Sequence, residues 1–481
     1  MDDIKYATTI GLEIHLQIST RTKAFCSCEN SFGREPNTSV CPVCLGMPGS
    51  LPVLNKEYLQ RAIKTALALN CQIVGRMKFD RKNYFYPDLP KNYQISQYAM
   101  PLSRGGFLEI MTPAGIKRVG ITRVHMEEDA GKLIHDEGGC FSLIDLNRAG
   151  APLLEIVSEP DIFSPDEAHL YLRTLKSVLE YLDVSDCNME QGSLRCDANI
   201  SLMPAGKKGL GAKVELKNMN SFRAIRQALE YEQERQARVL SSGGVIIQQT
   251  RLWNEKKKIT ELMRTKEEAH DYRYFPDPDL NDFIIEQSMV RAIEGLLPEM
   301  PQVKMNRFIK EYSLSEYDAR VLTADKHMAD FMEQSVKLYP KPKVVANWLI
   351  GSIQAYLNER NMEFSQLHIG PGRLVEMIRL IDSGALSNNM AKDILQVMLL
   401  SGKSAGDIVK EKDLFQITDK SAIAALAVDV LQSNPKVKDD YLSGKKNALG
   451  FLVGQLMKKS QGKANPVAAG QALKALLEGK S

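Results

Sequence analysis

The first strand that the sequence predicts constrains the fold of this chain most strongly. Between Ile10 and Ile18, apolar residues at even positions alternate with mostly polar residues at odd positions. This period of two predicts a β-strand with one face in a core and the other face exposed. Glu13 and His15 then lie on the same face, about 6–7 Å apart at Cβ, which is close enough to share a metal ion or to flank a substrate.

Three later segments repeat this mixture of apolar and acidic residues: 121–129, 194–202 and 213–218. The first contains Glu127 and Glu128, and the other two place Asp197 and Glu215 on their polar faces. Hard cations such as Mg²⁺ prefer carboxylate oxygens. Together the strands predict an antiparallel sheet whose solvated face is an acidic, metal-binding floor. A plain polar surface is the alternative interpretation of each strand taken alone.

The second half of the chain has a different pattern. The 481 residues are 44% hydrophobic and 25% charged, which is typical of a globular protein with about two to four domains. After residue 293, helical patterns punctuated by proline replace the alternating strands. We therefore expect an α+β chain with an antiparallel-sheet domain over 1–293, a helical domain over 294–405 and a small helical tail domain over 406–481.

Local signals place individual elements. Spacing of apolar residues predicts a helix over 56–69, and Ser164 and Ser221 occupy N-cap positions before two longer helices. A hairpin is expected between strands over 245–253 and 259–265. Further helices are expected over 302–312, 316–337, 343–358, 372–383, 387–401, 419–433, 446–459 and 466–477.

Four cysteines lie close together near the N-terminus: Cys26, Cys28, Cys41 and Cys44. The second pair has the usual spacing of a zinc knuckle, whereas the first pair is tighter. Two pairs joined by a short loop favour a structural zinc site, since four thiolates leave no open position on the metal. A redox-active thiol pair is the alternative. The remaining cysteines are scattered and are expected to be buried: Cys71, Cys140, Cys187 and Cys196.

Basic and aromatic residues alternate in the loop 79–88. Its polar candidates for holding phosphate, or for stacking on a base or ribose, are Arg81, Lys82, Asn83 and Tyr84. The alternative is a turn anchored by aromatic residues, with charges that only face solvent.

The C-terminal segment is basic. Residues 441–481 contain seven lysines and one acid, a net charge of +6, so the rest of the chain sums to −3. This asymmetry suggests a polyanionic partner, with a solvated lysine-rich surface as the alternative. No targeting signal and no apolar run of about 18 residues is visible, so we expect a cytoplasmic protein. The lysines that we expect to contact the polyanion are Lys445, Lys446, Lys458, Lys459 and Lys463.

Several motifs resemble those of the B-subunit family of the aspartyl/glutamyl-tRNA amidotransferase. They are Gly11–His15, Phe79–Asp88, His125–Lys132, Asp145–Arg148, Leu194–Ser201, Glu215–Asn218, Asp271–Pro276 and Gly450–Gly454. The resemblance runs from the first predicted strand to the last helix. It implies a cradle-shaped N-terminal domain, a helical domain, and a tail domain that contacts the outer corner of tRNA.

The resemblance implies an ATP-dependent carbon–nitrogen ligase of three subunits, with glutamine as amido donor. ATP would phosphorylate the side-chain carboxylate of mischarged Glu-tRNA(Gln) or Asp-tRNA(Asn), and ammonia would then displace the phosphate. A separate amidase (A) subunit would make the ammonia, and a small (C) subunit would complete the enzyme. This chain would carry the kinase and transamidase site and bind the tRNA.

The resemblance also assigns roles to residues. It implies that the magnesium ligands or their neighbours are Glu13, His15, Glu128, Asp197 and Glu215, with Glu127 beside them. The loop 81–84 would hold phosphate or the acceptor end, and the tail lysines would set a salt-dependent affinity for tRNA. The four cysteines match the zinc-bearing members, so zinc is expected to be structural and dispensable for the chemistry. The sequence has no P-loop or protein-kinase signature and no amidase signature, so ATP use rests on the resemblance.

Two other functions remain compatible with the sequence. The first is a non-catalytic, zinc-containing tRNA-binding protein, in which alanine at Glu13, Asp197 or Glu215 would leave function intact. The second is a metal-dependent phosphodiesterase, which would cleave RNA without ATP.

Overall fold

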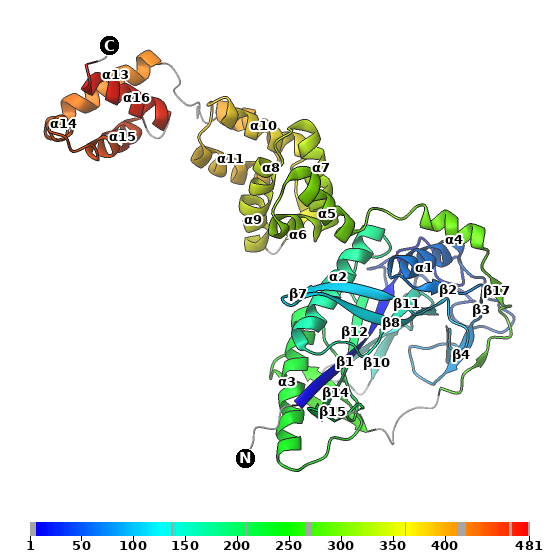
Figure 1. The fold of residues 1–481 in the computed structure, drawn as a ribbon. Helices are drawn as coiled ribbons and strands as arrows, with labels where there is room; N and C mark the ends of the chain where they lie inside the picture. Colours follow the sequence, from blue (N-terminus) through cyan, green and yellow to red (C-terminus); the bar gives the residue numbers. More distant parts are fainter. Residues whose placement is uncertain are drawn as a thin grey trace. The chain divides into compact units, whose positions relative to one another are not determined.

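The computed structural model describes residues 6–135, 139, 141–207, 209–265, 272–360, 362–411, 420–460 and 464–479. The chain divides into two compact units, Met1–Pro301 and Gln302–Ser481. Within the described ranges, every strand belongs to the first unit and the second unit is helical (Figure 1). The predicted α+β class is therefore confirmed.

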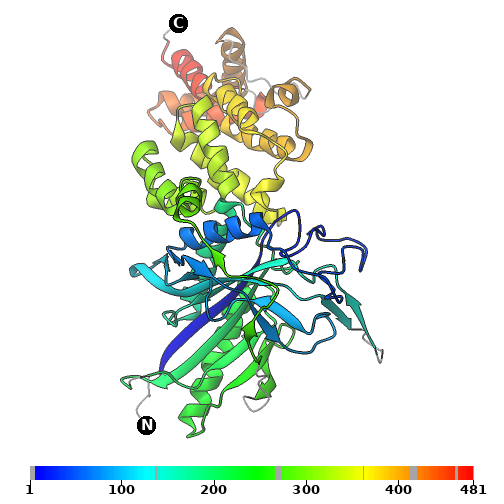
Figure 2. The ribbon, with the colours of Figure 1, turned by 90° about the vertical axis from the view of Figure 1, so that its right-hand side faces the viewer.

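An eight-stranded sheet forms the centre of the first unit (Figures 1 and 2). Its strands, in spatial order, are β15 (Ile259–Thr265), β14 (Gln249–Asn254), β13 (Val214–Lys217), β12 (Leu194–Pro204), β1 (Tyr6–Gln17), β11 (Pro152–Ser158), β8 (Gly115–Glu128) and β7 (Phe107–Thr112). All neighbours are antiparallel except β13 and β14. The parallel pair departs from the prediction because α3 (Phe222–Ser241) connects these strands as a crossover, which returns the chain in the same direction.

β1 shows the predicted alternation. Ile10, Ile14 and Leu16 are fully buried on one face, and Glu13 and His15 lie on the other. Burying each of these aliphatic side chains contributes about 1.5–3 kcal/mol. The helix α2 (Pro165–Leu182) packs against β7, and α3 packs against β12, so the two helices cover the apolar face (Figure 1). The polar face is thereby left for the site.

The local signals are confirmed at their key positions. Ser164 Oγ accepts a hydrogen bond from the Glu167 amide, and Ser221 Oγ accepts one from the Ala224 amide. Each cap contributes about 1 kcal/mol. The predicted helix over 56–69 is α1 (Lys56–Ala68), and the predicted hairpin joins β14 to β15, although β14 begins only at Gln249.

Small sheets surround the central one. β4 (Asp80–Asn83) lies between β5 (Tyr93–Ser96) and β16 (Phe275–Pro276), so part of the predicted basic loop is a strand. The other small pairs are β9 (Lys132–His135) with β10 (Ser142–Asp145), β3 (Arg76–Met77) with β17 (Phe283–Ile284), and β2 (Gln72–Ile73) with β6 (Ser103–Arg104).

The helical elements after the sheet are α4 (Gln287–Glu294), α5 (Pro301–Tyr312), α6 (Glu316–Thr323), α7 (Lys326–Leu338), α8 (Pro342–Trp348), α9 (Gln354–Arg360), α10 (Pro371–Asp382), α11 (Asn388–Ser401), α12 (Ala405–Glu411), α13 (Lys420–Ser433), α14 (Pro435–Leu442), α15 (Ala448–Lys459) and α16 (Pro466–Leu477). The prediction of one helix over 316–337 was wrong, because Asp325 caps a new helix by accepting from the Met328 amide. A π-helical turn, Leu349–Ile353, interrupts the predicted helix 343–358.

The last four helices, α13 to α16, have a core of their own. Ile423, Ala427, Leu452, Leu456 and Leu473 are buried in one cluster. The predicted domain boundary at 405/406 falls at the start of α12, and the three-domain division stays a prediction. No helix in the described ranges combines the length and apolar character that crossing a membrane requires.

Candidate active site and zinc site

The polar face of the central sheet brings His15, Glu127 and Glu155 together. His15 Nε2 lies 3.4 Å from Glu127 Oε1 and 3.4 Å from Glu155 Oε2. The strand register explains this, since His15 on β1 is opposite Glu155 on β11, which is opposite His125 on β8. His125 Nε2 lies 3.4 Å from the same oxygen of Glu155. Three adjacent strands thus contribute to one histidine–carboxylate cluster.

The charges in this cluster stabilise one another. Burial opposes a charge on His125, but the Glu155 and Glu127 carboxylates outweigh burial and raise the pKa of His125 to about 9. Burial opposes a charge on His15 too, and the same two carboxylates raise its pKa above the usual value. In return, the histidines overcome burial and lower the pKa of Glu127 and of Glu155. The cluster therefore favours a proton on each histidine and holds the one on His125 at neutral pH.

The cluster also has the composition of a divalent-cation site. One ligand atom each from His15, Glu127 and Glu155 lie within 4.8 Å of one another. Adjacent ligands of Mg²⁺ at bond lengths of about 2.0–2.1 Å are about 3 Å apart, close to the 3.4 Å contacts of His15. Two carboxylates and one imidazole on three strands therefore suit one hard cation, with room for oxygen ligands from water or substrate.

Glu128 lies outside this cluster. Successive residues of a strand point to opposite faces, so Glu127 and Glu128 cannot both face His15. The Glu128 carboxylate forms an ion pair with Lys91, and its Oε1 accepts a hydrogen bond of 2.9 Å from the Ile95 amide. The structure thus brings the neighbour, Glu127, to His15, whereas Glu128 is held by β5 and the segment before it.

Glu13, Asp197 and Glu215 form a second acidic group on the same face. Glu13 is opposite Asp197 in the register of β1 and β12, and Glu13 Oε1 accepts a hydrogen bond of 2.9 Å from Asn199. Lys217 forms an ion pair with Asp197, and its Nζ lies 3.2 Å from Glu215 Oε1. Burial opposes the Lys217 charge, but Asp197 and Glu215 raise its pKa. The Lys217 ammonium therefore offsets part of the negative charge of this group in the structure.

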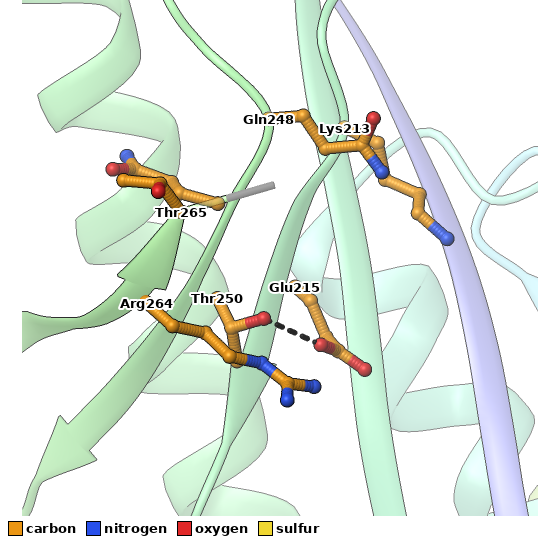
Figure 3. A pocket seen from close by; sticks show the side chains of 7 residues that line it. Lys213, Glu215, Gln248, Thr250, Arg264 and Thr265 are labelled. Atoms are coloured by element: carbon orange, nitrogen blue, oxygen red, sulfur yellow. Dashed lines mark hydrogen bonds between the residues drawn. The ribbon is translucent and has the colours of Figure 1, made fainter. Parts of the chain in front are cut away.

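A polar pocket of about 120 Å³ opens beside Glu215 (Figure 3). Lys213 and Arg264 contribute cationic side chains to its lining, together with Gln248 and Thr250. Thr250 Oγ1 donates a hydrogen bond of 2.7 Å to Glu215, drawn as the dashed line. Burial would raise the pKa of Glu215, but Lys217, this hydrogen bond and Arg264 lower it. The pocket thus combines anion-binding side chains with Glu215, a member of the second acidic group.

The predicted phosphate-binding residues differ in how far they are already engaged. Arg81 lies over the Tyr93 ring and forms ion pairs with Asp277, at 3.1 Å, and with Asp279, at 2.8 Å. Asn83 donates hydrogen bonds to the carbonyls of Arg81 and Arg273. Both side chains are therefore occupied in holding the three-stranded sheet.

Lys82 and Tyr84 interact electrostatically with Glu127 of the histidine–carboxylate cluster instead. Lys82 Nζ lies 4.9 Å from the centre of the Tyr272 ring, and its charge helps to lower the pKa of Glu127. Burial, and next to it the Glu127 charge, raise the pKa of Tyr84. In the part of the chain that the structure describes, Lys82 has no ion pair within 4 Å. Lys82 and Tyr84 are therefore the residues of the predicted loop that can act on a ligand near the cluster.

The four predicted zinc ligands also meet. One sulfur each from Cys26, Cys28, Cys41 and Cys44 lie within 4.8 Å of one another, and the Sγ atoms of Cys41 and Cys44 are 3.9 Å apart. Zinc–sulfur bonds of about 2.3 Å in a tetrahedron separate the sulfurs by about 3.8 Å. A hydrogen bond from Cys26 lowers the pKa of Cys44, against burial, and the charge of Lys23 lowers it further. The cluster therefore fits a zinc ion.

The other cysteines behave as expected where they are described. Cys71, Cys187 and Cys196 are buried, and Cys140 lies outside the described residues. The three described cysteines belong to the hydrophobic core of the first unit.

The predicted tRNA-binding lysines fall into two kinds. Lys445 pairs with Asp440 at 2.8 Å, and Lys459 pairs with Asp429. Lys446 and Lys458 are exposed and have no ion pair within the described tail. Lys463 lies outside the described residues.

Sequence reasoning missed three residues of the site. Glu155 and His125 complete the cluster, and Tyr58 of α1 donates its hydroxyl to the carbonyl of Glu127, at 2.9 Å, while accepting from the amide of the same residue. One signal was available, since Glu155 is the lone charge in the apolar run 152–157. A charged residue in such a run marks the polar face of a strand.

Comparison with known proteins identifies the family of the chain. A family model described as the GatB/GatE catalytic domain matches residues 8–291, and one described as the GatB domain matches residues 330–477. A protein from Caldanaerobacter subterraneus subsp. tengcongensis, named as the B subunit of aspartyl/glutamyl-tRNA(Asn/Gln) amidotransferase, is 54% identical over 98% of this chain and 99% of its own length.

Relatives with the same name come from other organisms. The protein of Carboxydothermus hydrogenoformans is 52% identical over 98% of each chain. That of Brevibacillus brevis is 52% identical over 96% of this chain and 97% of its own. Both family models and these full-length relatives lead to one assignment: the chain belongs to the B-subunit family of the aspartyl/glutamyl-tRNA amidotransferase.

Proposed function

We propose that this chain carries the kinase and transamidase site of a tRNA-dependent amidotransferase, in which an amidase (A) subunit and a small (C) subunit are its partners. In the proposed reaction, a side-chain carboxylate oxygen of Glu-tRNA(Gln) or Asp-tRNA(Asn) attacks the γ-phosphorus of ATP, and ADP leaves. Ammonia from glutamine hydrolysis on the amidase then attacks the acyl carbon, and phosphate leaves. The product is the amide, Gln-tRNA(Gln) or Asn-tRNA(Asn).

The histidine–carboxylate cluster is the observation that carries this proposal. Both reactants of the first step, a carboxylate and a triphosphate, are anionic, so their approach is repulsive unless cations neutralise them. His15, Glu127 and Glu155 would hold Mg²⁺, which supplies that positive charge when bound. Lys82, whose charge helps to lower the pKa of Glu127, adds a cationic side chain to the surroundings of this site.

The pocket beside Glu215 supports a nearby site for the nucleotide. Lys213 and Arg264 offer ammonium and guanidinium groups to phosphate oxygens, and the glutamine and threonine side chains add hydrogen-bonding groups (Figure 3). Glu215 lines this pocket, and Glu13 and Asp197 belong to the same acidic group. The three carboxylates would contribute to cation binding once Lys217 moves aside. The polar face of the sheet would then place triphosphate and carboxylate side by side.

Two further parts complete the proposal. The exposed lysines of the tail would bind the tRNA backbone through charge, which gives affinity without reading sequence. The cysteine cluster would hold a structural zinc ion. Glu128, paired with Lys91, would act beside the cluster and not as a ligand of the same cation.

Product analysis tests the proposal. The chain is co-expressed with the amidase and the small partner and supplied with glutamine, ATP, Mg²⁺ and each mischarged tRNA. We expect Gln-tRNA or Asn-tRNA only when this chain is present, and none when Glu127→Gln replaces it. Formation of no amide on either tRNA, with tRNA still bound tightly, would favour the non-catalytic binding protein. Cleavage of RNA without ATP would favour the phosphodiesterase.

A further inference from the structure

The zinc site lies directly against the ion pair of Lys91 and Glu128. Gly46, two residues after the ligand Cys44, has a positive φ of +68°, and a Cβ added to it would lie 2.4 Å from Lys91 Cγ. The backbone of the zinc loop, residues 39–46, therefore packs closely on the aliphatic part of Lys91. Only glycine permits both this approach and this backbone conformation without strain.

A second glycine, more distant in the sequence, lies between the zinc loop and Glu128. Gly150 also has a positive φ, +83°, and a Cβ added there would lie 3.3 Å from Cys44 Cβ and 3.7 Å from Glu128 Oε2. Its amide donates to the Asp129 carbonyl, and its carbonyl accepts from the Ala24 amide, each at 2.9 Å. A zinc ligand and the Glu128 carboxylate thus flank one tightly fixed glycine.

Lys23 ties the zinc loop into the fold. Its side chain is fully buried, and Nζ donates to the Ser39 carbonyl at 2.7 Å and to Cys44 Sγ at 3.7 Å. Zinc with four thiolates carries excess negative charge, which this buried ammonium offsets. Binding of zinc therefore fixes the thiolates, Lys23 and the loop as one body.

The ion pair that the loop covers belongs to the surroundings of the candidate active site. The side chains of Lys91 and Glu128 are only 8% and 3% exposed. β5 holds both neighbouring carboxylates, because the Ile95 amide donates to Glu128 and Ser96 Oγ donates to Glu127 at 3.3 Å. A displacement at Glu128 would therefore reach Glu127 and the cation site.

We propose that the zinc loop is a positioning device, which holds Lys91 on Glu128 and so keeps the adjacent Glu127 in place for the reaction. The effect on turnover rests on the proposed function, whereas the positioning of Lys91 does not. This assigns zinc a part in setting the site, in contrast to the expectation that it is dispensable for the chemistry. Lys91 and Gly46 act through Glu128 and are positioning residues.

Chemical labelling of lysines tests the positioning without an activity assay. The full-length chain, with zinc and after zinc is removed by a chelator, is treated with an amine-reactive acetylating reagent, and each lysine is followed by peptide mass spectrometry. We expect labelling of Lys91 to rise by at least about fivefold on zinc removal, because local opening exposes it. Lys117, paired with Glu167 in the same unit and 19% exposed, is the control and should not change.

Thiol alkylation at the four cysteines verifies that zinc has left. An unchanged labelling rate at Lys91, with the cysteines alkylated, would overturn the proposal. A parallel rise at Lys117 would overturn it as well, because zinc would then stabilise the whole unit and not this contact.

A pair of glycine variants keeps zinc in place. Gly46→Ala forces a methyl group against Lys91, whereas Gly49→Ala, in the same region and with a similar φ of +83°, meets nothing within 4 Å. Both variants place alanine at a similar positive φ, so they are matched in backbone strain. We expect both to retain zinc, and only Gly46→Ala to raise Lys91 labelling.

The same pair links positioning to turnover. In the assembled enzyme, Gly46→Ala should lower kcat for phosphorylation of the mischarged tRNA by about tenfold or more, with an unchanged KM for tRNA. Equal labelling and equal kcat in the two variants would overturn the proposal. A third outcome separates the two proposals. If Gly46→Ala raises Lys91 labelling but the parent enzyme forms no amide, the positioning proposal stands and the proposed function is refuted.

Discussion

His15 Nε2 lies 3.4 Å from Glu127 Oε1, although His15 is on β1 and Glu127, the second-last residue of β8, lies two strands away in the sheet. The intervening strand, β11, carries Glu155 on the same face and at the same level. Three strands that are far apart in the sequence therefore build one cluster, and the rigidity of the sheet fixes its geometry. A site built on strands in this way is held more precisely than one built on loops.

Glu155→Gln should disable this cluster. The amide keeps the shape of the side chain but removes the charge that neutralises a cation. Affinity for Mg²⁺ and the rate of tRNA phosphorylation should fall by more than about 100-fold, since even groups outside the ligand shell of a metal contribute about 10–100-fold. Transfer of ³²P from γ-labelled ATP to mischarged tRNA measures the rate, and filter binding should show unchanged tRNA affinity.

Glu159→Gln is the matched control for this variant. Glu159 follows β11, and its carboxylate accepts a hydrogen bond from Thr122, away from His15. It should keep the parent rate. Equal activity of the two variants would show that Glu155 does not serve the reaction.

Binding of Mg²⁺ at the cluster should release a proton. His15 can coordinate a cation only in its neutral form, and Glu155 and Glu127 raise its pKa above about 6.5. Below that raised pKa the cation must displace a proton, so the apparent affinity should increase with pH through it and then level off. Calorimetric titration of the chain at pH 6, in two buffers of different ionisation enthalpy, measures the release. A binding heat that is identical in both buffers, after buffer dilution is subtracted, would contradict it.

Tyr58→Phe should loosen the end of β8. The Tyr58 hydroxyl donates toward the carbonyls of Glu127 and Leu153 and accepts from the Glu127 amide, all within the core. Its removal leaves buried backbone groups without this partner, which costs about 1–3 kcal/mol. Chemical denaturation should show that loss in the free energy of unfolding. Tyr171→Phe is the control, because the buried Tyr171 hydroxyl has no hydrogen-bond partner within the described residues, and its loss should be neutral.

The contrast between the predicted and observed sites has a physical reason. Alternation within β1 was enough to place Glu13 and His15 on one face, because a strand alternates strictly. Whether Glu127 or Glu128 meets His15 depends on the pairing of β8 with β11, and that register arises from contacts distant in the sequence. The acids occupy both faces at the end of β8, so local pattern does not decide between them.

Other differences arise from tertiary contacts as well. Arg81 reads as a phosphate-binding residue in the sequence, yet Asp277 and Asp279 engage it from a segment almost two hundred positions away. The zinc ligands, by contrast, could be predicted, because both pairs lie within one short loop and need only local chain closure. The contact of Lys217 with Glu215 is local as well, since residues two apart share a strand face.

Lys217→Met should weaken the second acidic group and make it responsive to Mg²⁺. It leaves Asp197 and Glu215, each about one-fifth exposed, without the ammonium between them. The free energy of unfolding at pH 7 should fall by about 1–2 kcal/mol, less than the about 3–5 kcal/mol for a fully buried pair, because water screens the charges. Millimolar Mg²⁺ should restore part of the loss, since a cation can replace the ammonium.

The control for this variant is Lys257→Met. Lys257 pairs with Glu261 on the surface, and its loss should leave stability unchanged with or without Mg²⁺. Thermal or chemical denaturation measures both variants. A magnesium response that is the same in the two would contradict a cation-binding role for Asp197 and Glu215.

The two kinds of tail lysine separate direct contact with tRNA from overall charge. The double variant Lys446→Ala/Lys458→Ala removes exposed lysines without a described ion pair, whereas Lys445→Ala/Lys459→Ala removes lysines that Asp440 and Asp429 already engage. Both change the net charge equally, so any difference between them comes from where the lysines point. The first should lower the slope of log affinity against log salt by about 1.5, because two phosphate contacts are lost, and the second by less. Filter binding of tRNA over a salt series measures both slopes, and an equal or larger drop in the second variant would show that the exposed pair does not contact the backbone.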